Sequence, residues 1–315
     1  MNAIHVNFIG VALFFSATLA AGPIAVITNQ GSNNVALVDL SSRSVIETID
    51  VGVKPAGIVI SPDNKRIFVS NPESKSVSVI DADKRQQIAE ISVGDGPVGL
   101  AISADGSEVF VADWYKHLVT VINTQKLEPD RVIDVGLSPS GIIASSIEPL
   151  LYVANRDDNN VMIINPRSGK VENSIEVGEA PFGIALSADE KELYVANVRT
   201  NNVSVIDLNK REVIANIEVG LRPYAITIAK EKLFVTNQWD NSVSVIDLAT
   251  YEPVTTIDVG EYPEGIDSGP NEDFVYVANW FDGTLSIIDT TSLETVDTVK
   301  TGEGSRAFGK FILND

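Results

Sequence analysis

The sequence has 315 residues, contains no cysteine and carries a formal net charge of −20, from 43 acidic and 23 basic residues. The absence of thiols excludes disulfides, haem attachment through C-x-x-C-H, a lipid-anchored cysteine, thiolate metal sites and a cysteine nucleophile. The negative charge argues against nucleic acids and anionic membrane surfaces as partners.

The first segment is an apolar run from Phe8 to Ala20. It is too short to span a bilayer and is typical of the core of a signal peptide, with small residues at Thr18 and Ala20 for cleavage. No Lys or Arg precedes the run, so a different chain start or a buried N-terminal segment stays open. We predict a signal peptide over residues 1–20, an extracytoplasmic protein (periplasmic, secreted or on the cell surface), and no membrane span after cleavage.

From residue 24 onward, one sequence unit is repeated seven times. Each copy has a Tyr-Val-Ala-Asn-like segment, whose final Asn or Asp recurs at intervals of 42, 42, 42, 42, 40 and 42 residues. These final residues are Asn29, Asn71, Asp113, Asn155, Asn197, Asn237 and Asn279. A Val-Gly pair, replaced by Thr301-Gly302 in the last copy, recurs with the same spacing.

Each copy contains four short segments rich in Val, Ile and Tyr and bounded by Gly, Pro, Asn or Asp, which is typical of β-strands. In one copy they are residues 182–187, 192–198, 202–207 and 213–220. We name the four strands of a copy A, B, C and D in chain order, where A is the strand that follows the proline a few residues after Val-Gly. No window beyond residue 20 has a helical period. The pattern predicts an all-β, seven-bladed β-propeller of four-stranded antiparallel blades.

The copies are offset from the chain ends. The first copy begins on a B strand at residues 24–29, and residues 305–314 have the sequence of an A strand. We therefore predict that the C-terminal strand pairs with the N-terminal strands and closes the ring. Residues 21–315 would then form a single propeller domain, expected to be a monomer.

The segments Val26–Asn29, Tyr194–Asn197 and Phe234–Asn237 resemble the repeats of the YVTN family of β-propellers, found in archaeal surface-layer proteins and bacterial secreted proteins. The resemblance covers residues 24–313. It implies a propeller scaffold and leaves the activity open, because this fold serves many functions.

Residues present in every copy are expected to serve the fold. The Asn that ends strand B suits the turn that follows it, and the Asp that ends strand C should organise the C–D turn. The glycine of Val-Gly is expected to adopt turn dihedrals that other residues resist. Residues 61–64 and 103–106 are predicted to be hairpin turns.

The loops that differ between copies are the better candidates for function. Antiparallel strands place the B–C and D–A loops on one rim, here called the top face, and the A–B and C–D turns on the opposite, bottom face. The B–C loops hold all three tryptophans and the one histidine beyond residue 20. An exposed Trp favours contact with a partner, and the alternative is that each Trp packs on its own blade. The binding candidates from these loops are Trp114, Tyr115, His117, Trp239, Trp280 and Phe281.

The first residues of the A strands should surround the channel at the top face. In chain order they are Ala56, Val98, Ser140, Phe182, Tyr224, Glu264 and Arg306. Three short residues followed by four large or charged ones predict a recess beside an aromatic and charged wall, which is a typical ligand site. The alternative for Glu264 and Arg306 is a salt bridge between neighbouring blades. The binding candidates here are Phe182, Tyr224, Glu264 and Arg306, with Lys54, Arg222 and Tyr262 just outside them.

Three functions are compatible with this pattern. The favoured one is a non-catalytic recognition propeller that binds a glycan, peptide, protein or small molecule on the top face, with no cofactor or metal. The second is a hydrolase similar to the seven-bladed lactonases, a resemblance that implies carboxylates and sometimes a divalent cation at the channel; the spacing indicates no paired carboxylates or metal-ligand cluster. The third is a periplasmic redox accessory, similar to propellers that carry haem d1 or surround quinone-derived cofactors, for which His117 on a rim loop is a poor axial ligand.

Overall fold

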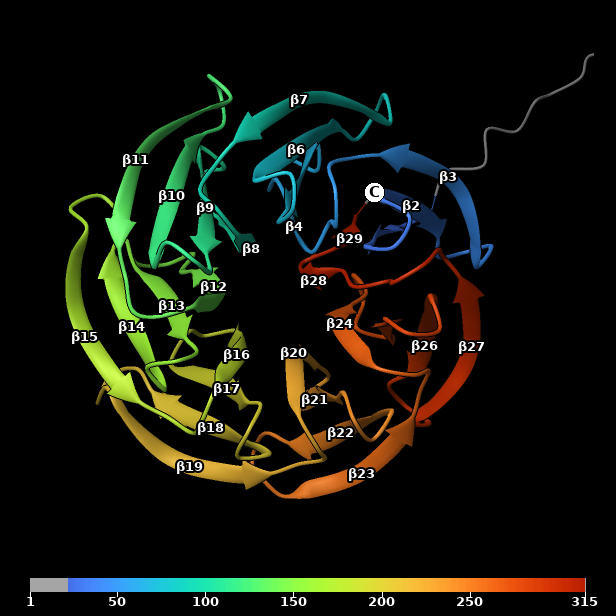
Figure 1. Cartoon of the computed structure of the whole chain (residues 1–315). Helices are drawn as coiled ribbons and strands as arrows, with labels where there is room; N and C mark the ends of the chain where they lie inside the picture. The colour runs from blue at the N-terminus through green and yellow to red at the C-terminus, as the bar shows by residue number, and fades with distance from the viewer. Residues whose placement is uncertain (1–21, 315) are drawn as a thin grey trace, which may run out of the picture.

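The computed structural model describes residues 22–314, which form seven β-sheets arranged as the blades of a ring around a central channel (Figure 1). The predicted all-β, seven-bladed propeller is therefore confirmed. The predicted signal peptide at residues 1–20 lies outside the described residues. Within residues 22–314 the structure has no helix of the length and apolarity needed to cross a membrane.

Five blades are each built from four consecutive antiparallel strands, with strand A innermost and strand D outermost. Blades 3, 4 and 5 contain β8 (Pro97–Ile102), β9 (Glu108–Asp113), β10 (Leu118–Asn123), β11 (Glu128–Asp134), β12 (Pro139–Ala144), β13 (Leu151–Asn155), β14 (Asn160–Asn165), β15 (Lys170–Glu176), β16 (Pro181–Leu186), β17 (Glu192–Asn197), β18 (Asn202–Asp207) and β19 (Glu212–Glu218). Blades 6 and 7 contain β20 (Pro223–Ala229), β21 (Lys232–Asn237), β22 (Ser242–Asp247), β23 (Pro253–Asp258), β24 (Pro263–Ser268), β25 (Phe274–Asn279), β26 (Thr284–Asp289) and β27 (Glu294–Lys300).

The ring closes where the two ends of the described chain meet. Blade 1 has the strand order β29-β1-β2-β3, from β29 (Ile312–Leu313), β1 (Ile24–Asn29), β2 (Asn34–Asp39) and β3 (Ser44–Asp50). The antiparallel pairing of β29 with β1 confirms the predicted closure. Blade 2, made of β4 (Gly57–Ile60), β5 (Arg66–Asn71), β6 (Ser76–Asp81) and β7 (Gln86–Ser92), gains a fifth strand, because β28 (Phe308–Gly309) pairs in parallel with β4. The closing segment thus holds two blades, where the sequence predicted one.

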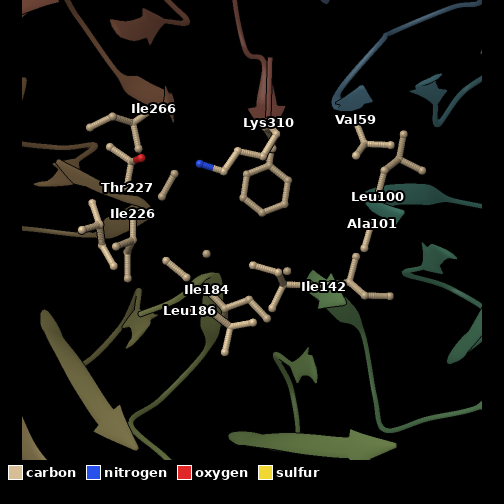
Figure 2. Close-up of a pocket in the computed structure, with 18 of the residues that line it drawn as sticks. Val59, Leu100, Ala101, Ile142, Ile184, Leu186, Ile226, Thr227, Ile266 and Lys310 are labelled. Atoms are coloured by element: carbon tan, nitrogen blue, oxygen red, sulfur yellow. The ribbon is translucent and has the colours of Figure 1, made fainter. Parts of the chain in front are cut away.

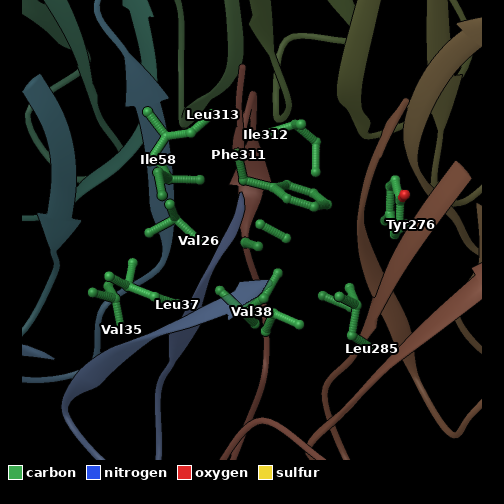
Figure 3. Packing of buried hydrophobic residues seen from close by; sticks show 14 of the residues in the cluster. Val26, Val35, Leu37, Val38, Ile58, Tyr276, Leu285, Phe311, Ile312 and Leu313 are labelled. Atoms are coloured by element: carbon green, nitrogen blue, oxygen red, sulfur yellow. The ribbon is translucent and has the colours of Figure 1, made fainter. Parts of the chain in front are cut away.

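The core lies between neighbouring blades, where the apolar faces of adjacent sheets meet. The cluster at the ring closure combines side chains from β1, β2, β4, β25 and β26 with the C-terminal residues 311–313. Figure 3 shows the fully buried ring of Phe311 among the aliphatic side chains of this cluster. Residues of β1 and of the C-terminal segment also exchange backbone hydrogen bonds, such as Val26 N to Phe311 O at 2.9 Å.

The turns follow the predicted chemistry. Asn64 N and Gly106 N donate to the carbonyls of Ser61 and Ser103 and close the two predicted hairpin turns. The last residue of strand C accepts backbone N–H groups of the C–D turn in every blade; Asp289, for example, accepts Thr291 N and Ser292 N at 2.8 Å.

The glycine of the Val-Gly pair has a different role from the predicted one. In the first six copies its φ angle is not positive, so the prediction of an unusual turn dihedral is wrong. A Cβ on Gly136 would lie 2.6 Å from Cγ of Asn155, the buried residue that ends strand B, and Gly136 N donates to Asn155 Oδ1 at 3.1 Å. Glycine is needed there because this side chain packs directly on the loop that links two blades.

A second repeated glycine lets the inner strands approach each other. A Cβ on Gly141 of β12 would lie 2.0 Å from the carbonyl oxygen of Phe182 in β16, and Gly57, Gly99 and Gly265 face the next A-strand segment in the same way. The A strands therefore pack nearly backbone to backbone, which narrows the channel.

Candidate functional site

The top face is organised by a repeated contact between its two sets of loops. Asn33 Oδ1 of a B–C loop accepts Lys54 N of the next D–A loop at 2.9 Å, and Asn201 Oδ1 accepts Arg222 N in the same way. This places both sets of loops on one rim, as the alternation of strands predicted. The exposed Lys54 belongs to this rim, on the loop between blades 1 and 2.

His117 occupies the repeat position that holds asparagine in four other blades. It shares their left-handed backbone, with a φ of 58°, and its Nδ1 accepts Ser138 N at 3.0 Å. The imidazole thus substitutes for the amide oxygen of Asn33, Asn159, Asn201 and Asn241. Its position is explained by loop geometry, without any ligand.

Four predicted aromatic residues gather at blades 6 and 7. The exposed fractions of Phe281 and Trp239 are 67% and 54%, and Tyr262 and Trp280 are partly exposed. The ring centroids of Tyr262, Trp280 and Phe281 are 6.3 Å apart pairwise, and Tyr262 N donates to the B–C loop that carries Trp239. Arg222 Cζ lies 4.5 Å from the ring centroid of Trp239. We call Arg222, Trp239, Tyr262, Trp280 and Phe281 the aromatic ledge.

The other predicted aromatics pack together at the channel axis. The rings of Phe182 and Tyr224 are stacked with centroids 4.1 Å apart, and Phe308 lies 4.8 Å from Phe182. The ring centroid of Trp114 lies 6.2 Å from that of Phe182, and Arg156 Cζ lies over the Trp114 ring at 5.4 Å. We call Trp114, Phe182, Tyr224 and Phe308 the channel plug. Phe182 and Tyr224, predicted as the wall of an open recess, are buried in it. Tyr115 lies apart, 69% exposed on the B–C loop of blade 3.

Glu264 and Arg306 form the salt bridge that the sequence offered as an alternative. Glu264 Oε2 is 2.7 Å from Arg306 Nε, and Glu264 Oε1 accepts Gln238 Nε2 at 2.7 Å. Arg306 also donates to the hydroxyl of Tyr224. Burial raises the pKa of Glu264, and Arg306 and Gln238 oppose that shift. Because Glu264 Oε1 accepts a hydrogen bond from Gln238 and Oε2 is in ion-pair contact with Arg306, although Oε2 accepts no hydrogen bond, the arrangement favours a structural link over a free acid or base.

The cavity within the channel lies on the other side of the plug. Its volume is about 460 Å³, and it is lined by the ends of the A strands and by Ala188 and Glu272 of A–B loops, so it lies toward the bottom face. Figure 2 shows Lys310 extending into it among apolar residues such as Leu100, Ile142, Ile184 and Ile226. Phe308 borders both the plug and this cavity. The sequence predicted a recess at the top end of the channel and gave no sign of this cavity toward the bottom face.

In the part of the chain that the structure describes, no group of three or more His, Asp or Glu side chains is placed to hold a metal ion.

Known proteins resemble this chain in fold. No protein-family model and no curated protein sequence matches it. A hydrazine synthase chain from Kuenenia stuttgartiensis is 23% identical, with a TM-score of 0.77 over 89% of this chain and 99% of its own length. A functionally unknown protein from Desulfotomaculum acetoxidans is 12% identical, with a TM-score of 0.78 over 91% and 99%.

A third solved structure is the dihydro-heme d1 dehydrogenase NirN in complex with DHE. It is 18% identical, with a TM-score of 0.69 over 90% of this chain and 66% of its own length. At these identities the likeness shows the shared propeller fold and no shared activity.

Proposed function

We propose that this protein is an extracytoplasmic recognition propeller of the YVTN type, which binds a protein partner through the aromatic ledge of its top face. The observation that carries the proposal is the grouping of Trp239, Tyr262 and Phe281 on adjacent loops with their rings exposed. Large exposed aromatic rings contribute contact area at low cost in side-chain entropy, and Trp, Tyr and Arg dominate binding energy at interfaces.

The surroundings of the ledge favour a protein surface over a small ligand. Val53, Leu137 and Leu221 on other D–A loops are also exposed, so apolar side chains extend around the rim. A small ligand needs a concave site that buries most of its surface, and the ring centre is filled by the channel plug. A broad rim with aromatic, aliphatic and arginine side chains is the composition found at the centre of protein interfaces.

The extracytoplasmic location is supported by the apolar run at residues 8–20, and the absence of cysteine does not conflict with it. N-terminal sequencing of the natively produced protein tests this part. A mature chain that starts near Ala21 would support export, and a cytosolic protein with Met1 intact would contradict it.

The binding proposal is tested with the double variant Trp239→Ala/Phe281→Ala as bait for proteins of the exported fraction of the source cells. The matched control is Ile147→Ala, which removes an exposed aliphatic side chain from the bottom face. For the purified partner we expect affinity to fall at least tenfold with the double variant, about 1.4 kcal/mol, and to stay unchanged with the control. A partner that tolerates the double variant and is lost with Ile147→Ala would show that the opposite face binds.

A further inference from the structure

The channel cavity has a polar corner at a repeat position that is uncharged and mostly apolar in the other blades. One position of the A strands contributes Ile102, Ala144, Leu186, Ile228 and Ser268 to the cavity lining. In the seventh copy the same position holds Lys310. Since the other blades fold without a cation there, the lysine is specific to this cavity and is not required by the repeat.

Lys310 is held in place by a buried carboxylate. Its Nζ lies 2.9 Å from Asp267 Oδ1, while Asp267 Oδ2 accepts Phe311 N and Ile312 N at 2.9 and 3.2 Å. The Lys310 side chain is 65% exposed and Asp267 only 4%, so the ammonium group faces the open space of the cavity. Asp267 uses one of the three N–H groups, which leaves donors directed at a cavity occupant.

Thr227 is the second polar group of this corner. It is 2% exposed, and its Oγ1 has no hydrogen-bond partner within residues 22–314. Figure 2 shows this oxygen on the side of Thr227 that faces the end of Lys310. A buried hydroxyl without a partner is unfavourable, because it has lost its hydrogen bonds to water. Four other copies have apolar residues at this position, Val59, Ala101, Ile143 and Ala185, so the fold does not require the hydroxyl.

The charges of Lys310 and Asp267 determine which hydrogen-bond acceptor a ligand can place in the polar corner. The ammonium of Lys310 is already balanced by Asp267, and a carboxylate on a ligand would lie close to that negative charge. An uncharged carbonyl oxygen can accept from both Lys310 and Thr227 without this repulsion. The remaining lining is mainly aliphatic, and a volume of about 460 Å³ is in the range of small-molecule sites. We propose that the channel cavity binds a compact, uncharged, mainly apolar molecule whose carbonyl oxygen accepts hydrogen bonds from Lys310 and Thr227.

The proposal is tested with two probes of equal chain length, methyl hexyl ketone and octanoate, titrated into the full-length mature protein by calorimetry and ligand-observed NMR. We expect saturable binding of the ketone at one site, and octanoate to bind at least tenfold more weakly. Octanoate binding as tightly as the ketone would overturn the choice of an uncharged ligand. Failure of the ketone to bind saturably would overturn the proposed site.

Variants then locate the site. Thr227→Val preserves shape and removes an unpaired hydroxyl, so it should fold normally and weaken ketone binding about fivefold, the effect of one neutral hydrogen bond. Lys310→Met should weaken binding further, and Lys170→Met, which removes an exposed lysine from a bottom-face turn, should not. Ala144→Phe should fill the cavity and abolish binding.

Ketone affinity that stays unchanged in Thr227→Val and Ala144→Phe would overturn the assignment of the binding site to this cavity. The Trp239→Ala/Phe281→Ala variant should bind the ketone normally, which separates this site from the top face.

Discussion

Glu264 Oε2 lies 2.7 Å from Arg306 Nε at the top of the channel, and this contact joins strand β24 of blade 7 to the C-terminal segment that completes blades 1 and 2. The carboxylate is 6% exposed, so its charge depends on the guanidinium and on Gln238.

Removing the guanidinium should therefore destabilise the protein strongly. Arg306→Met leaves Glu264 buried without its counter-ion, which costs about 3–5 kcal/mol of unfolding free energy at pH 7. The pKa of Glu264 is raised in the folded state, so the folded protein binds its proton more readily than the unfolded chain, and stability falls as pH rises through that pKa. This loss of unfolding free energy should accordingly shrink toward pH 4, where the raised pKa leaves Glu264 protonated and in no need of a counter-ion. Denaturant unfolding at pH 7 and pH 4 measures the free energy of unfolding. An equal loss at both pH values would contradict the role of Arg306 as the counter-ion of Glu264.

The ring closure should depend on one aromatic side chain. Phe311 is fully buried, so Phe311→Ala is expected to lower the free energy of unfolding by about 3–5 kcal/mol, whereas Phe281→Ala on the exposed ledge should change it by no more than about 0.5 kcal/mol.

Deletion from Ser305 onward should expose the edges of β1 and β4 and promote aggregation, and deletion of residues 314–315 should be nearly harmless. Melting curves compare the two truncations. Equal midpoints would place the closure elsewhere.

The three tryptophans should divide into structural and exposed residues. Trp114 packs on Phe182 and Arg156, so Trp114→Ala should lower the unfolding free energy by about 2 kcal/mol, less than for a fully buried Trp. Trp239→Ala loses mainly its contact with Arg222, about 0.5 kcal/mol. Trp280 donates from Nε1 to Gln30 Oε1 of blade 1 and should be intermediate. Urea titrations monitored by far-UV circular dichroism rank the three, and the reverse order for Trp114 and Trp239 would refute the division.

Acid should weaken one bottom-face turn. Asp105 accepts hydrogen bonds from Ser103 Oγ and from the backbone N and Oγ of Ser107, which lower its pKa from 3.8 to about 2. Because the folded-state pKa lies below the unfolded one, this stabilisation is present above about pH 4 and is lost as pH falls toward 2. Asp105→Asn should thus melt below the wild type at pH 7 and approach it near pH 2. Asp83→Asn is the charge-matched control, and a constant difference for Asp105→Asn between pH 7 and 2 would contradict this account.

The repeat predicts the fold well because a strand can be recognised from the local pattern of its own residues. The segments predicted at 182–187, 192–198, 202–207 and 213–220 are found as β16 to β19, with ends shifted by two residues or fewer. The split of the last A strand into β28 and β29 was not predictable in this way. Gly309, with a φ of 131°, breaks that strand, so that it pairs first with blade 2 and then with blade 1.

The candidate sites were less accessible from sequence, because which side of a loop packs against a neighbour is a tertiary property. Phe182 and Trp239 have similar chemistry in the sequence, yet one is buried in the channel plug and the other is exposed. A comparison down each repeat position, and not only along each copy, would have shown His117 in a position that mostly holds asparagine and Lys310 in one that is otherwise uncharged and mostly apolar. It would not have shown that Lys310 and Thr227 meet in one cavity, since 83 residues, the rest of blade 6 and the whole of blade 7, separate them in the sequence.

The placement of the closing strands also sets an order of events during synthesis. Blade 1 has no innermost strand, and the Asp267 carboxylate lacks its contacts with Lys310, Phe311 and Ile312, until residues 310–313 have emerged from the ribosome. A nascent chain is therefore an open arc of blades until these residues are available. We expect pulse-labelled chains to become protease-resistant in one step, when residues 305–313 are released, and not blade by blade.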